Sequence, residues 1–129
     1  MNDIILSIKP EYVQKIIEGT KKYEYRRRIA KENIRNIYIY STYPIMKVVA
    51  KVEVVGVLAA SPSSLWENTK SMAGISRIKY REYFKGCKIA YAYELAKVVV
   101  FDEPKELIEY NITFPPQSFV YLSDENNTN

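Results

Sequence analysis

The stretch that decides the fold is Gly19-Thr20-Lys21-Lys22-Tyr23-Glu24-Tyr25-Arg26-Arg27-Arg28. Gly19 suits the left-handed residue that ends a helix, and a charged strand is expected from about Lys21 to Arg28. Because side chains alternate along a strand, charge gathers on one face, which carries Lys22, Glu24, Arg26 and Arg28. The opposite face carries Tyr23, Tyr25 and Arg27. One glutamate among several cations indicates a site for an anionic or hydrogen-bonding ligand, for which nucleic acid is the leading candidate.

The segment before this stretch predicts a strand and then a helix. Residues 4–8 are a short apolar run, and the Lys9-Pro10 pair that follows places a proline where a helix can begin. Apolar side chains then recur at helical spacing, at Tyr12, Val13, Ile16 and Ile17. We therefore expect an amphipathic helix of about two and a half turns that ends at Gly19.

The segment after this stretch predicts further strands with two short helices between them. Strands are expected over residues 36–42, 47–58, 89–95, 97–101 and 119–122, and the third and fourth can also be read as one long bent strand. Gly56 marks a bulge or bend in the longest of them. Ser61 and Ser76 are expected to cap helices, the second over residues 77–85, and Gly74 breaks the run between them. Residues 106–110 predict a weak helical segment or a loop.

This order of elements predicts an α+β fold. We expect a small mixed β pseudo-barrel of about six strands, with two to three short helices packed outside it. A chain of 129 residues forms one domain, which we place over residues 1–122. The polar residues 123–129 follow the last apolar run and are expected to be a disordered tail.

Composition excludes several kinds of site. The sequence has no histidine and one cysteine, Cys87, so neither a histidine-dependent catalytic triad nor a zinc site is expected. We therefore predict no metal and no cofactor, and any acid–base chemistry has to use carboxylates, lysines or tyrosines. No apolar run is long enough for a membrane span, and the N-terminus lacks the features of a signal peptide. A cytoplasmic protein with no membrane partner is expected.

Charge is distributed unevenly along the chain. Residues 21–35 hold seven basic and two acidic side chains, and residues 77–88 hold five basic and one acidic side chain. Residues 94–125 are acidic instead, with seven acidic and two basic side chains. In the second of these segments, Arg77, Arg81 and Lys85 repeat every four residues and form a basic stripe on the predicted helix. Such a stripe is usually a solvated face, but beside the charged strand it would extend one surface that follows a phosphate backbone.

Aromatic residues allow two interpretations as well. Tyrosines pair along the predicted strands, where they either pack in the core or form a platform on which unpaired bases stack. They are Tyr23, Tyr25, Tyr38, Tyr40, Tyr91 and Tyr93. Trp66 is expected to anchor its short helix on the sheet.

Five short motifs, taken in their order and spacing, resemble the ASCH domain, a branch of the PUA-like superfamily. They are Ile5-Leu6-Ser7-Ile8-Lys9-Pro10-Glu11-Tyr12, Gly19-x-Lys21-x-x-Glu24-x-Arg26, Ser61-Pro62-x-x-Leu65-Trp66, Gly74-Ile75-Ser76 and Pro116-Gln117-Ser118. The resemblance runs from about Asp3 to Leu122. It implies a pseudo-barrel whose cleft is lined by the Gly-x-Lys…Arg strand, and RNA binding, which is proposed for most members.

One branch of the family that this chain resembles hydrolyses acetylated cytidine. In that branch a lysine, a threonine three residues later and a glutamate before the second helix carry catalysis. By position, Lys21 matches the lysine, Glu24 replaces the threonine, and the glutamate falls near Met72 or Ala73. The resemblance therefore implies the fold more strongly than that activity.

The candidate site centres on Lys21, Glu24 and Arg26, which we expect to take a base or phosphate of RNA or of a modified nucleotide. The alternative for Glu24 and Arg26 is a plain surface ion pair. Four arginines are expected to hold the flanking backbone: Arg27, Arg28, Arg77 and Arg81. Gln117 reads a base edge or bonds a loop backbone.

Three functions follow from these candidates. The first is a nucleic-acid-binding module. The second is a small hydrolase, an amidohydrolase or a nuclease, in which Lys21 activates water and Glu24 acts as general acid and base. The third is a protein-interaction domain with an acidic partner. The sequence does not predict an oligomeric state.

Overall fold

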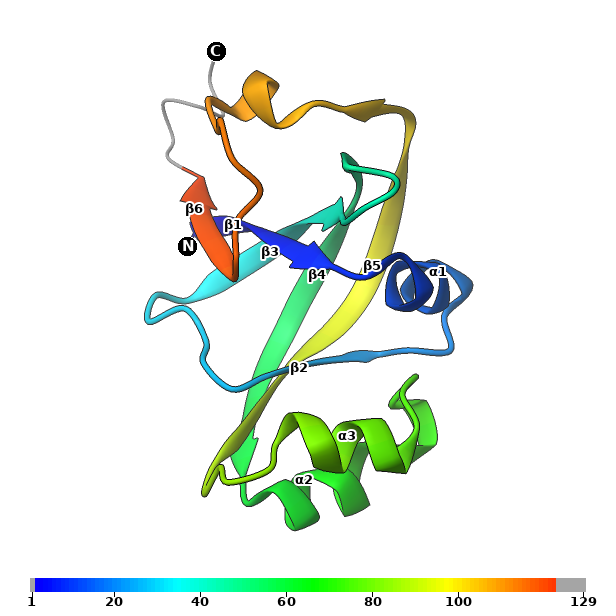
Figure 1. Cartoon of the computed structure of the whole chain (residues 1–129), viewed down its shortest axis with the longest axis vertical. Coiled ribbons are helices and arrows are strands. Elements are labelled where there is room, and N and C mark those ends of the chain that lie inside the picture. The colour runs from blue at the N-terminus through cyan, green and yellow to red at the C-terminus, as the bar shows by residue number, and fades with distance from the viewer. Residues whose placement is uncertain (1, 123–129) are drawn as a thin grey trace.

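A six-stranded mixed sheet forms the body of the molecule in the computed structural model, which describes residues 2–122. The strands are β1 (Asn2–Ile8), β2 (Tyr23–Arg26), β3 (Ile34–Ser41), β4 (Lys47–Ala60), β5 (Ala90–Lys105) and β6 (Phe119–Leu122). Their order across the sheet is β2-β5-β4-β3-β1-β6, and of these neighbours only β1 and β3 run parallel. Figure 1 shows β4 and β5 running along much of the length of the molecule.

The sheet is bent but not closed. Its two edges, β2 and β6, are not paired with each other within the described residues. The predicted α+β class, with about six strands and two to three helices, is confirmed, and the mixed sheet is not closed. The predicted tail over residues 123–129 lies outside the described residues.

Three helices pack outside this sheet within residues 2–122: α1 (Pro10–Glu18), α2 (Pro62–Thr69) and α3 (Arg77–Tyr83). Gly19 ends α1 with a φ of 85°, and Ser61 and Ser76 accept the backbone N–H groups of Ser64 and Lys79, so the predicted caps are confirmed. Two 3-10 turns, η1 (Lys70–Met72) and η2 (Leu107–Tyr110), complete the described elements. The second confirms the weak helical segment predicted over residues 106–110.

The strand boundaries differ in part from the predicted ones. Of the two readings of residues 89–95 and 97–101, the single long strand is confirmed, as the 16-residue β5. The charged strand is only four residues long, because the Lys22 N–H donates to the Met72 carbonyl and the chain leaves the sheet after Arg26. The bend predicted at Gly56 is confirmed, since the register of β4 against β5 shifts between Val54 and Gly56.

Two packed clusters place β2 where it can form a site. The larger cluster seals α1 against the sheet through Val13 and Ile16. The smaller one packs α2 and α3 onto the other end of β4 and β5, where Ala90 and Ala92 leave room for the helices and Tyr25 reaches in from β2. In Figure 1, β2 and its approach therefore pass between α1 and the α2–α3 pair.

Candidate functional site

A cavity of about 520 Å³ opens where β2 passes between the end of β1 and α3. We call it the Lys21 cavity. Its lining comes from β1 and α1, from β2 and its approach, and from α3 and the residue before it. These residues are Ser7, Ile8, Lys9, Tyr12, Lys21, Glu24, Tyr25, Arg26, Ile75, Lys79, Glu82 and Tyr83.

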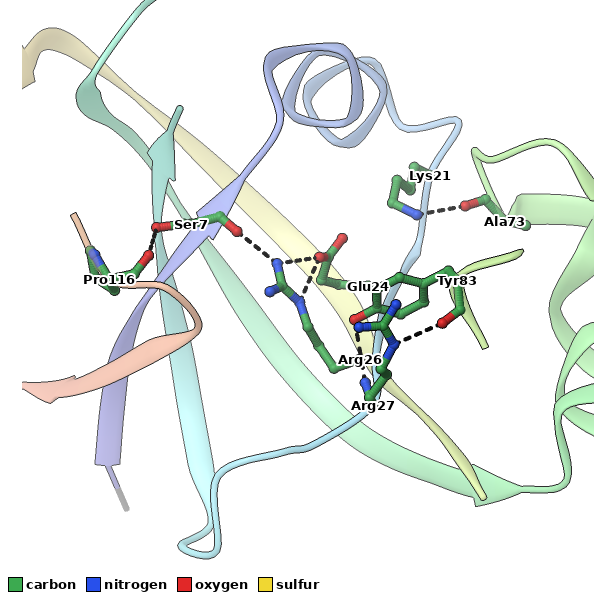
Figure 2. Close-up of polar contacts among 8 residues, drawn as sticks. All are labelled: Ser7, Lys21, Glu24, Arg26, Arg27, Ala73, Tyr83 and Pro116. Atoms are coloured by element: carbon green, nitrogen blue, oxygen red, sulfur yellow. Dashed lines mark hydrogen bonds and ion pairs between the residues drawn. The ribbon is translucent and has the colours of Figure 1, made fainter. Parts of the chain in front are cut away.

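Lys21 is a buried cation at the base of this cavity. Only 3% of the residue is exposed, and its Nζ donates a hydrogen bond to the Ala73 carbonyl at 2.7 Å (Figure 2). The ammonium also lies 5.2 Å from the centre of the Tyr12 ring and 4.8 Å from that of Tyr25. Both distances fall within the range of cation–π attraction.

Gly74 makes this burial possible. A Cβ atom at this residue would lie 2.4 Å from Cβ and 2.6 Å from Cγ of Lys21, so only glycine lets the lysine stem pass. The backbone of Gly74 also has a φ of +64°, which side chains disfavour. Gly74, predicted to break the helical run, thus also lines the narrow space that holds the Lys21 side chain, which we call the lysine channel.

Burial lowers the pKa of Lys21 to about 8, although the nearby Glu24 carboxylate raises it in part. The amine therefore remains mostly protonated at neutral pH and loses its proton at mildly alkaline pH. One of its three N–H bonds goes to Ala73, and no other described residue accepts from it. The remaining donors are available to a ligand.

Glu24 and Arg26 lie two residues apart in β2 and form an ion pair. Arg26 donates from Nε at 3.0 Å and from Nη2 at 2.7 Å, both to Oε2 of Glu24. The side chains are 7% and 15% exposed, so the interpretation as a surface pair is wrong. Oε1 of Glu24 accepts no hydrogen bond from the described residues and is not sealed from solvent. It is an acceptor open to the cavity.

Arg26 also spans the opening of the sheet. Its Nη2 donates to the Ser7 carbonyl at 2.7 Å, which ties the edge strand β2 to β1 (Figure 2). Ser7 in turn donates from Oγ to the Pro116 carbonyl at 2.6 Å, and its N–H donates to Ser118 at 3.4 Å. Side chains and a loop close the gap that the strands leave open.

Gln117 lies in this same connection, between the two residues that Ser7 contacts. Its side chain is exposed and makes no hydrogen bond within residues 2–122, so the alternative of a loop-backbone bond is not realised. It does not line the Lys21 cavity. Its predicted role as a reader of base edges stays a prediction.

Tyr25 lines the cavity with its uncharged ring, and its hydroxyl is already bonded within the fold. The Thr69 hydroxyl donates to the Leu65 carbonyl at 2.7 Å, so the Tyr25 hydroxyl donates to Thr69 Oγ1 at 2.6 Å. Burial raises the pKa of Tyr25 well above its ordinary value. Of the tyrosines considered for base stacking, Tyr25, Tyr40 and Tyr93 are buried in the core.

The two arginines after β2 differ in what they contact. Arg27 donates from Nε to the Tyr83 carbonyl at 2.7 Å, and its guanidinium carbon lies 4.3 Å from the centre of the Tyr83 ring. The side chain thus fastens β2 to the end of α3 (Figure 2). Arg28 is exposed and forms no hydrogen bond or ion pair with a described residue.

Arg77 and Arg81 do not join the Lys21 cavity. They line a second hollow of about 320 Å³ between α2 and α3, which also includes Trp66 and which we call the Trp66 hollow. The face of α3 that lines the Lys21 cavity carries Lys79 and Glu82 instead. The basic stripe predicted on this helix and the charged strand therefore do not form one surface.

A model of the ASCH domain family matches residues 6–105. The chain belongs to the ASCH domain family. It is 31% identical over 129 residues to an ASCH domain-containing ribonuclease of Zymomonas mobilis, a match that covers 95% of this chain and 86% of that protein. The crystal structure of ASCH from Zymomonas mobilis superposes with a TM-score of 0.89 at 28% identity, covering 98% of this chain and 91% of the other.

Longer proteins contain a similar segment. An ATP synthase subunit alpha of Ureaplasma parvum is 28% identical over 120 residues, and a large ribosomal subunit protein uL22 of the same species is 29% identical over 120 residues. Each match covers 92% of this chain but only 15% and 39% of those two proteins.

Several lining residues of this ASCH domain were missed as site residues from the sequence, among them Tyr12, Lys79 and Glu82. Tyr12 was assigned to the apolar face of α1, and Lys79 and Glu82 to no site. The spacing of Lys79, Glu82 and Tyr83 at positions i, i+3 and i+4 could have indicated the residues of α3, because this spacing puts their side chains on one face of the helix. Lys79 also lies 3.7 Å from Glu11 of α1, an ion pair that links the two helices.

No group of three or more metal-ligating side chains occurs among residues 2–122. Within the same range, no helix has the length and apolarity to cross a membrane.

Proposed function

We propose that this ASCH domain binds single-stranded RNA and takes one nucleotide into the Lys21 cavity. The observation that carries the proposal is the convergence of a buried ammonium, an open carboxylate oxygen and a fixed guanidinium on one cavity with tyrosine walls. The cavity volume of about 520 Å³ falls in the range of small-molecule sites. The relative named as a ribonuclease acts on RNA, and it matches nearly the whole chain.

Each group has a distinct task in such a complex. Lys21 donates to a phosphate or to an acceptor on the base edge, and Oε1 of Glu24 accepts an N–H of the base. Arg26 keeps both hydrogens of Nη1 for a ligand, because its described bonds use Nε and Nη2. The lining carries four cations, Lys9, Lys21, Arg26 and Lys79, against Glu24 and Glu82. That excess of two positive charges favours an anionic ligand.

The direct test is a titration of the chain against fluorescently labelled single-stranded RNA at several salt concentrations. We expect binding that weakens as salt rises, because phosphate contacts release counterions. Lys21→Met keeps the length of the side chain and removes its charge, and should weaken binding about ten- to hundredfold, the worth of one or two charged hydrogen bonds. Lys97→Met is the matched control, because Lys97 is exposed on β5 and lines neither cavity. Equal affinity of both variants would refute the proposal.

RNA hydrolysis is the second candidate, and one observation favours it. The Lys21 amine, with a pKa of about 8, shares the cavity with an open carboxylate oxygen, so one group can give and the other take a proton near neutral pH. We expect a hydrolase to produce shorter fragments of labelled RNA on a gel, at a rate that changes through about pH 8 and falls in both Lys21→Met and Glu24→Gln. Bound RNA that stays intact would leave binding as the function.

The other two functions have less support. Deacetylation of acetylcytidine in the manner of the related branch needs a carboxylate near Met72 or Ala73, and the contact made there is the Ala73 backbone carbonyl. A flat acidic protein surface fits poorly into a concave cavity whose central charges, Lys21 and Glu24, are buried. If the chain releases no acetate when it is incubated with acetylcytidine, the deacetylase function is excluded.

A further inference from the structure

The Trp66 hollow lies between α2 and α3, on the side of α3 that does not line the Lys21 cavity. Its volume is about 320 Å³. The lining that matters here is an aromatic floor with charged side chains around it: Trp66, Tyr80, Phe84, Glu67, Arg77 and Arg81. None of these side chains contributes to the site described above.

The aromatic floor is rigid and leaves one ring accessible. Tyr80 and Phe84 are each 2% exposed, and the Tyr80 hydroxyl donates to the Pro62 carbonyl at 2.7 Å. Trp66 is half-buried, with its ring centre 4.8 Å from that of Tyr80. Its predicted role as an anchor is compatible with this contact, but the indole N–H donates to no described residue. A planar ligand can stack on the exposed part of this ring.

The two arginines, Arg77 and Arg81, bond no described side chain or carbonyl, which distinguishes them from Arg26 and Arg27. Arg77 and Arg81 are exposed, lie one helical turn apart, and form no ion pair or hydrogen bond with any residue from 2 to 122. The one carboxylate in the lining, Glu67, is paired with Lys70 at 2.7 Å. The charge of Arg77 also acts on Glu67 through space, but neither arginine forms an ion pair with it, so positive charge is in excess beside the aromatic surface.

From this arrangement we infer that the Trp66 hollow is a second nucleotide-binding site, in which a base stacks on Trp66 and the phosphate contacts Arg77 and Arg81. The inference rests on the proposed function, because the nucleotide belongs to the same RNA strand whose neighbour enters the Lys21 cavity. The two sites share α3, and a helix is only about 10–12 Å across, so a short strand passing over it reaches both. Guanidinium forks and aromatic faces together are the usual means of holding unpaired nucleotides.

The sole tryptophan of the chain makes the test direct, since its fluorescence reports on this hollow alone. We expect a single-stranded oligoadenylate of about ten nucleotides to quench Trp66 fluorescence as it binds. In the double variant Arg77→Ala/Arg81→Ala the quenching should disappear, and the logarithmic salt slope should fall by about 1.4 for two lost phosphate contacts. The control Lys51→Ala/Lys97→Ala removes two charges from β4 and β5 and should keep the quenching.

Adenosine monophosphate separates the two sites. We expect it to quench Trp66 in the wild type and in Lys21→Met, but not in Arg77→Ala/Arg81→Ala. If RNA binding depends on Lys21 while Trp66 fluorescence stays unchanged, the hollow is not a nucleotide site and the proposed function stands. If no RNA binds at low salt, the proposed function fails instead. Quenching by an acidic peptide in place of RNA would overturn the nucleotide assignment.

Discussion

The Lys21 cavity and the Trp66 hollow lie on different sides of α3 and hold their charges in opposite ways. In the cavity every central charge has a partner in the fold: Lys21 bonds Ala73, and Arg26 bonds both Glu24 and Ser7. In the hollow, Arg77 and Arg81 are exposed and contact no described residue through hydrogen bonds or ion pairs. The first site is built into the tertiary structure, whereas the second is attached to its surface.

This difference decides what a substitution reveals. A change in the Lys21 cavity alters packing, proton binding and ligand contacts together, because buried polar groups carry desolvation costs. A change of a free surface arginine alters ligand contacts almost alone, since such positions usually affect stability by no more than about 0.5 kcal/mol. Stability measurements can therefore separate the two kinds of site without any ligand.

The largest effect is expected from Gly74→Ala. The new methyl group would collide with the Lys21 stem at 2.4 Å and would force an alanine into a φ of +64°. Strain and overpacking together should lower the free energy of unfolding by about 2–4 kcal/mol in urea titrations. Gly86→Ala is the matched control, because it has a φ of +83° and nothing within 4 Å of the added atom. A loss equal to that of the control would mean that the lysine channel is not tight.

The next effect is a pH dependence that belongs to Lys21. Because burial lowers its folded pKa to about 8, the unfolded chain binds more protons above that pH, and stability contributed by this group rises with pH. Between roughly pH 7 and 9.5, the wild type should gain about 2 kcal/mol of unfolding free energy relative to Lys21→Met. Taking the difference between the two proteins removes the contribution of the tyrosines. Parallel curves would show that the lysine is not buried in solution.

Local chemistry was enough to predict most elements of this fold. Gly19, Ser61 and Ser76 act within a few residues of themselves, and each ends or begins a helix as predicted. The register of β4 also shifts at Gly56, where a bend was predicted. The sequence also indicated Lys21, Glu24 and Arg26 as site residues. The structure places all three in the lining of one cavity, and their roles remain predictions.

Distant contacts explain what could not be predicted. Alternation along the strand gives no sign that Lys21 is buried, because its partners, Ala73 and Gly74, lie more than fifty residues away. The direction of α3 was equally hidden, since the stripe of Arg77 and Arg81 faces α2 only because of how the helix docks. Ile78, which lies between these two arginines in the chain, is 72% exposed for the same reason.

A smaller effect is expected where a loop closes the open sheet. Ser7→Ala removes the hydrogen bond from Oγ to the Pro116 carbonyl and should lower the free energy of unfolding by about 1 kcal/mol. The backbone contacts of Ser7 with Arg26 and Ser118 remain, so the strand itself should persist. Ser118→Ala is the control, because its exposed side chain makes no hydrogen bond among the described residues. If both variants unfold at the same urea concentration as the wild type, the bond between Ser7 and Pro116 does not fasten the loop.

The smallest effects are expected at Arg27 and Arg28, two neighbouring residues that test the same contrast between bonded and free charges. Arg27 is committed to Tyr83 as the cavity charges are to their partners, while Arg28 is free like the arginines of the hollow. Arg27→Ala should therefore cost about 0.5–1 kcal/mol of stability, the worth of an exposed cation–π contact with its hydrogen bond, and change RNA affinity little. Arg28→Ala should leave the urea midpoint unchanged and weaken RNA binding, with a shallower salt dependence. The opposite pattern would mean that burial and partners in the free protein do not identify which charges meet the ligand.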